Sequence, residues 1–157
     1  MEEVVLTTLQ VDRLQGAMAA SLEGRLSSCA LRKYINVDDE LERILEKLHQ
    51  IDSTQPLNLT FPEDVPFDDI KSSLLALCGL SGEAIQVEDD VNDYWYSLGV
   101  DAAASPVAAN GTGANPLHVD MLTFSDFPRG MAILCERPDP QGGGATILAP
   151  HGNVRAI

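Results

Sequence analysis

The sequence predicts an α+β fold in a single domain over residues 1–157, with a mainly helical part (1–82) and a strand-rich part (83–157). In the first part, apolar residues recur at the one-turn spacing of amphipathic helices. In the second part, from Leu117 on, short apolar runs alternate with turns rich in Pro and Gly. With 157 residues, of which 45% are hydrophobic, the chain is long and apolar enough to enclose one core.

Three helices are predicted in the first part. The first begins at Val11, and the second follows Asn36, a suitable N-cap residue. The third runs from about Asp68 to Cys78 and ends at Gly79, placed where a left-handed C-terminal cap would lie. Their apolar stripes are Leu14, Met18, Leu22 and Leu26; Leu41, Ile44, Leu45, Leu48 and Ile51; and Ile70, Leu74, Leu75 and Leu77.

Three strands are predicted in the second part, at Leu117–Phe124, Gly130–Cys135 and Thr146–Ala149. They follow a tract rich in Ala, Gly and Asn, residues 102–116, which is too poor in apolar bulk to be core. We expect this tract to be a long loop, and loops of that length are usually functional or mobile.

Charge and cysteine content narrow the classes of partner and compartment. The net charge is −14, with 24 acidic against 10 basic residues, which argues against binding to nucleic acid or anionic membranes. The three cysteines are far apart, so neither a disulfide framework nor a zinc site is expected. The acidic N-terminus does not resemble a signal peptide, and no apolar run approaches the roughly 18 residues of a membrane span. We therefore expect a cytoplasmic protein.

His118-Val119-Asp120 opens the first predicted strand and is the strongest candidate for chemistry. Residues i and i+2 of a strand point to the same side, so the imidazole and the carboxylate can hold one metal ion. Such a pair is part of the facial arrangement of non-haem Fe(II) oxygenases. The alternative is a strand-end histidine whose hydrogen bonds are satisfied by a nearby carboxylate. A second histidine ligand is not evident, because His151 lies in a turn only a short connection away.

Thr146 follows the Gly-rich turn that precedes the last predicted strand. Its hydroxyl can donate a hydrogen bond to a carboxylate ligand, and the alternative is that it only serves the strand. The glycines before it lack the Lys-Ser/Thr of a phosphate-binding loop, which disfavours nucleotide binding.

These residues resemble those of the taurine dioxygenase/clavaminate synthase-like family of Fe(II)- and 2-oxoglutarate-dependent oxygenases. The family pattern is a Leu-His-x-Asp/Glu strand, an apolar strand ending near Cys-x-Arg-Pro, and a Gly-Gly-x-Thr turn. The matching segments, which lie within residues 100–157, are Asn115–Asp120, Ile133–Pro138 and Gly143–Thr146.

The resemblance implies a fold, an activity and a set of roles. The fold is a double-stranded β-helix, or jelly roll, of which this chain would hold a part. His118 and Asp120 would be iron ligands, Thr146 would contact a carboxylate of 2-oxoglutarate, and Asn115 would flank the substrate entrance. The activity is oxidative decarboxylation of 2-oxoglutarate coupled to hydroxylation of a small metabolite, such as an amino acid or natural-product intermediate.

The chain departs from the family pattern in its last third. Members carry a second histidine ligand and a carboxylate-binding arginine on late strands, beyond the Gly-Gly-x-Thr turn, and Arg155 lies too close to Thr146 to match that arginine. We therefore expect the N-terminal portion of such an oxygenase, truncated or split, with a second copy or a complementary chain covering its open strand edges. The alternative is a catalytically inactive binding or interaction module that docks to a partner chain. The substrate and the outcome of the oxidation stay open.

Overall fold

The structure is a computed structural model. It describes residues 2–21, 28–50, 56–84, 94–95, 99, 103–105, 113, 128, 130–137 and 140. The chain divides into two compact units, one formed by Met1–Ala84 with Gly130–Ile157 and the other by Ile85–Arg129. The predicted single domain over residues 1–157 stays a prediction.

The described helices and strands all lie within residues 2–81, in an order that mixes the two types. They are β1 (Glu2–Val5), α1 (Thr8–Ala20), α2 (Ser28–Leu31), α3 (Asp39–Gln50), β2 (Leu57–Thr60) and α4 (Phe67–Ser81). This combination confirms the α+β class for the described part of the chain. The jelly roll stays a prediction, because the predicted strands Leu117–Phe124 and Thr146–Ala149 lie outside the described residues.

β1 and β2 form a two-stranded parallel sheet that the sequence did not predict. Val4 pairs in register with Leu59, and the ladder continues past β1, where the Leu6 N–H donates to the Thr60 carbonyl at 2.8 Å. Side chains alternate along β1, so Val4 and Leu6 are buried while Val5 is 61% exposed. One face of the sheet therefore contributes to the core and the other faces outward.

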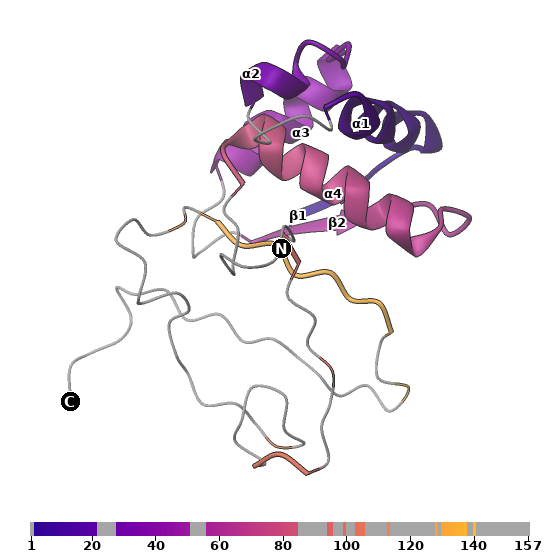
Figure 1. The fold of residues 1–157 in the computed structure, drawn as a ribbon, viewed down its shortest axis with the longest axis vertical. Coiled ribbons are helices and arrows are strands. Elements are labelled where there is room, and N and C mark those ends of the chain that lie inside the picture. Colours follow the sequence, from indigo (N-terminus) through magenta and orange to yellow (C-terminus); the bar gives the residue numbers. More distant parts are fainter. Residues whose placement is uncertain are drawn as a thin grey trace, which may run out of the picture. The chain divides into compact units, whose positions relative to one another are not determined.

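The helices gather on one side of this sheet, and α4 is the element they share (Figure 1). α4 packs most extensively on α1 and also contacts α2 and α3. Three of the predicted stripe residues are buried, namely Leu14 on α1 and Leu74 and Leu77 on α4. Met18, Ile70 and Leu75 are half-buried, and Leu22 and Leu26 lie outside the described residues. The largest fully buried side chains of the described core are Leu6, Val11, Leu14, Leu31, Leu41, Leu45, Leu77 and Leu80.

Side-chain caps explain where α1 and α3 begin. Thr7 and Gln10 form a capping box, in which the Gln10 N–H donates to the Thr7 hydroxyl and the Thr7 N–H donates to the Gln10 side chain. The prediction that Asn36 caps α3 was wrong. Asp38 accepts the Leu41 N–H at 2.9 Å and is also paired with Arg13 on α1, so tertiary contact selects it.

α4 extends further than predicted. Gly79 is not its C-terminal cap but a buried residue inside the helix, and the chain leaves the helix at Gly82, in extended backbone. Gly79 was the wrong stop because the apolar face continues to Leu80, which is buried. Within the described part of the chain, no helix has both the length and the apolarity of a membrane span.

Candidate functional site

The four residues that the sequence selected for function are His118, Asp120, Thr146 and Asn115. All of them lie outside the described residues, so the structure gives no distance between any two of them. Among the residues that are described, no three His, Cys, Asp or Glu side chains come together in a group that could hold a metal ion. The iron site stays a prediction.

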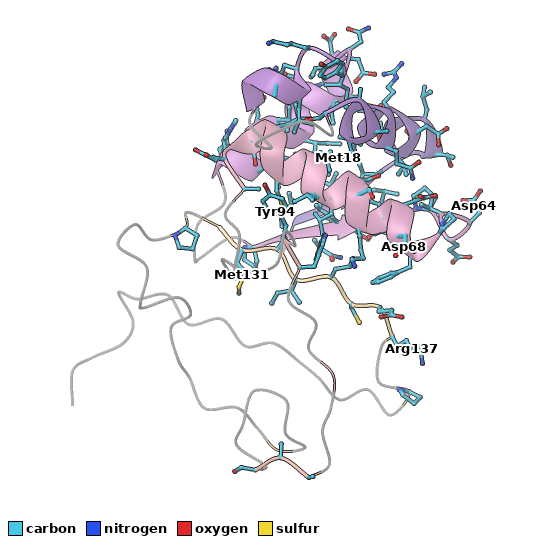
Figure 2. All side chains as sticks on the ribbon, viewed as in Figure 1. Met18, Asp64, Asp68, Tyr94, Met131 and Arg137 are labelled. Atoms are coloured by element: carbon cyan, nitrogen blue, oxygen red, sulfur yellow. The ribbon has the colours of Figure 1, made fainter. Side chains whose placement is uncertain are left out.

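One segment of the family-like pattern is described, residues 130–137. The prediction of a strand at Gly130–Cys135 was wrong for this structure, because these residues carry no strand pairing. The side chains of Met131 and Ile133 are 57% and 65% exposed. In Figure 2, Met131 and Arg137 extend from an irregular stretch of chain. An apolar run forms a buried strand only where another strand accepts its backbone hydrogen bonds, and none of the described strands does so here.

The described part of the chain does contain a hollow, which lies between β1 and α3 and has a volume of about 220 Å³. On the β1 side it is lined by three consecutive residues, Glu3 to Val5. Successive side chains of a strand point to opposite faces, so only the edge of a strand presents three consecutive residues to one space. No residue of β2 lines the hollow. It therefore lies along the edge of β1 that faces away from β2.

α3 supplies the other wall of the hollow through one helical face. The residues are Glu40, Arg43, Ile44 and Lys47, at the i, i+3, i+4 and i+7 spacing of a continuous stripe. Ile44 is buried at the centre of this stripe. Glu40 stands at one end and Lys47 at the other, and the middle of the wall holds Arg43 beside the apolar Ile44.

Two titratable groups near these helices have shifted pKa values. The hydrogen bond that the Leu41 N–H donates to Asp38 lowers the pKa of the Asp38 carboxyl, and the nearby Arg13 guanidinium lowers it further. Burial in α4 raises the pKa of the Cys78 thiol, which makes it a poor nucleophile at neutral pH. Neither group lines the hollow.

Glu40, Arg43 and Lys47 lie off the apolar stripe that the sequence predicts for this helix, so the sequence did not indicate the hollow. The stripe on α3 was a visible signal, yet the strand opposite it was not predicted. Without β1, the stripe has the pattern of an ordinary solvated helix face.

Comparison of the chain with protein-family models, with curated protein sequences and with solved structures gives no match.

Proposed function

We propose that this chain is the N-terminal portion of an Fe(II)- and 2-oxoglutarate-dependent oxygenase that hydroxylates a small metabolite. The single observation that carries the proposal is the ordered series His118-x-Asp120, then an apolar run ending in Cys135-Glu136-Arg137-Pro138, then Gly143-Gly144-Ala145-Thr146. Each part of this series occurs by chance in many proteins, but the order and spacing together resemble the oxygenase family.

The donor set fits Fe(II) in its chemistry. His118 offers an imidazole nitrogen and Asp120 a carboxylate oxygen, which are two of the three ligands in a facial triad. Iron bound there with 2-oxoglutarate supplies the oxidising power for hydroxylation. In this proposal Thr146 donates a hydrogen bond to a carboxylate of 2-oxoglutarate, and Asn115 borders the entry of the substrate. The remaining histidine and the arginine come from outside residues 1–157.

Metal binding tests the proposal without requiring turnover. Calorimetric titration with Fe(II) or Mn(II) under anaerobic conditions should show binding that weakens at least roughly ten-fold in Asp120→Ala and in His118→Ala. Asp64→Ala and His49→Gln are the matched controls, because Asp64 and His49 are exposed residues of the first unit. Equal affinities in all five proteins would refute the iron site.

Turnover is the second measurement. With Fe(II) and 2-oxoglutarate, the wild-type chain should form more succinate than His118→Ala and as much as His49→Gln. If metal binding depends on His118 and Asp120 but succinate does not, the chain holds the metal without the chemistry.

The second candidate is a catalytically inactive interaction module, and one observation favours it. Met131 and Ile133 lie in the middle of the family-like series and are largely exposed. Exposed apolar residues in an unpaired segment suit a docking surface. Metal binding that is insensitive to His118 and Asp120 would favour this candidate over the first.

A further inference from the structure

The outer edge of β1 offers backbone hydrogen bonds that nothing described takes up. In a parallel pair, every second residue points its N–H and C=O at the partner strand, and the residues between point theirs away. The Leu6 N–H donates to Thr60 across the sheet, so the even-numbered residues of β1 face β2. Glu3 and Val5 therefore direct their backbone groups outward, and the structure records no partner for those groups among the described residues.

The hollow beside this edge suits a strand better than a small molecule. Its volume of about 220 Å³ is below the range of roughly 300–1,000 Å³ that is usual for ligand sites. It follows β1 over three consecutive residues, Glu3 to Val5. A strand that entered here would gain hydrogen bonds from Glu3 and Val5 and would lie beside Ile44 of α3.

The charges around the hollow are arranged so that the surface complements itself. On α3, Glu40 and Lys47 stand at opposite ends of the stripe, with Arg43 and Ile44 between them. On β1, Val4 is the middle residue of the lining. A two-fold axis through the hollow would reverse both elements, which brings Glu40 of each copy opposite Lys47 of the other. Interfaces between identical subunits related by a two-fold axis require this kind of self-complementarity.

We propose that the chain forms a two-fold symmetric dimer through the outer edge of β1, with the second copy as the occupant of the hollow. The two β1 strands run antiparallel. Glu3 of each copy pairs with Val5 of the other, and each pair exchanges two backbone hydrogen bonds. Val4 meets its own counterpart on the axis. All the outward groups of Glu3 and Val5 are satisfied, and the two sheets become one four-stranded sheet, β2-β1-β1-β2. This dimer does not depend on the iron site.

Charge reversal on α3 tests the proposal through the oligomeric state of the full chain. Sedimentation velocity over about two decades of micromolar concentration, at roughly 0.15 M salt to screen the net charge of −14, should show wild type passing from monomer to dimer. Glu40→Lys and Lys47→Glu each place like charges opposite one another twice per dimer. We expect the dissociation constant to rise roughly ten-fold or more in each single variant.

The double variant Glu40→Lys/Lys47→Glu restores opposite charges across the two-fold axis, and its dissociation constant should return to within about three-fold of wild type. Glu46→Lys is the matched control, since Glu46 is an exposed residue of α3 outside the hollow, and it should dimerise as wild type does. Val5→Pro removes one outward N–H without touching the bonds to β2, and it should abolish the dimer while circular dichroism shows the helices intact.

Three results would overturn the proposal. The first is a wild-type chain that stays monomeric over the whole range, as it would if its own Met131–Cys135 segment filled the edge. The second is single variants that dimerise like wild type. The third is a folded double variant that fails to recover, because only a second copy of the same surface is restored by exchanging the two charges.

Discussion

The contact between α1 and α4 yields the sharpest stability prediction, at Ser73. This residue is 0% exposed, and its hydroxyl bonds to Val11 of α1 across the most extensive helix contact of the described chain. Ala17 of α1 and Ala76 of α4 are equally buried. Three small side chains with no exposed surface indicate that the helices approach closely. Ser73→Leu adds bulk where no solvent-filled space receives it, and we expect a loss of about 1–3 kcal/mol in the free energy of unfolding.

Ser73→Ala separates packing from hydrogen bonding at the same position. The Ser73 hydroxyl donates to the Val11 carbonyl at 3.4 Å, well beyond the roughly 2.7 Å of a strong O–H···O bond. Losing so long a bond should lower the free energy of unfolding by less than about 1 kcal/mol, because removing the hydroxyl also removes the cost of burying it. The alanine variant should therefore be much closer to wild type than the leucine variant.

Urea unfolding followed by far-ultraviolet circular dichroism measures both variants. With a slope of about 1–3 kcal/mol/M, a loss of about 2 kcal/mol lowers the midpoint by roughly 1 M. Ser72→Leu is the matched control, because the adjacent Ser72 is only half-buried and its hydroxyl bonds within α4, to the Asp68 carbonyl. A Ser73→Leu variant as stable as wild type, or no more affected than Ser72→Leu, would refute a close α1–α4 contact.

Two further predictions follow from the shifted pKa values. The pKa of Asp38 is lowered by the Leu41 N–H and by Arg13, so its stabilisation is present above pH 3.8, the ordinary value, and is lost as the pH falls through the lowered pKa. Asp38→Asn, which keeps a capping side chain, should be less stable than wild type at pH 6 and should approach it in acid, as thermal melts at each pH would reveal. Cys135 is exposed while burial raises the pKa of Cys78, so maleimide should modify Cys135 roughly ten-fold faster or more. Equal labelling rates by mass spectrometry would contradict the burial of Cys78.

The helices were predictable because their signals are local. The apolar face of α3 is indicated by the spacing of apolar residues within twelve positions alone. Leu41, Ile44 and Leu45 are buried as that spacing indicates. The exact start of α3 was not predictable in this way. Asn36 and Asp38 are both good capping residues, and what selects Asp38 is Arg13, which lies on another helix.

The sheet could not be read from the sequence for a different reason. β1 and β2 are four residues each, too short to show a clear alternation, and β1 begins with two glutamates. Their pairing joins Val4 to Leu59 across the length of three helices. Parallel pairing at that separation has no local signature, because the intervening chain decides which strands meet.

The candidate catalytic residues, unlike the helices and the sheet, were selected from the sequence alone. His118, Asp120 and Thr146 were selected by spacing and by resemblance, and the structure does not describe them. The apolar run at Gly130–Cys135 shows the limit of such reasoning, because composition indicates that a segment can be a strand but not that a partner is present to receive it. Where the partner is absent from the described chain, the same composition gives an exposed segment, as Ile133 does here.

The strand edge without a described partner is on β1, which is not where the sequence led us to expect a second chain to attach. The sequence led us to expect unpaired strand edges in the part of the chain that carries the iron-binding pattern, where a complementary segment would also supply the missing ligands. The structure instead places an open edge on β1, at the start of the chain and beside a self-complementary face of α3. Self-association through β1 uses none of the residues of the proposed oxygenase site, so the two can be tested separately. Charge reversal at Glu40 should weaken the dimer without changing the metal affinity that tests the oxygenase site.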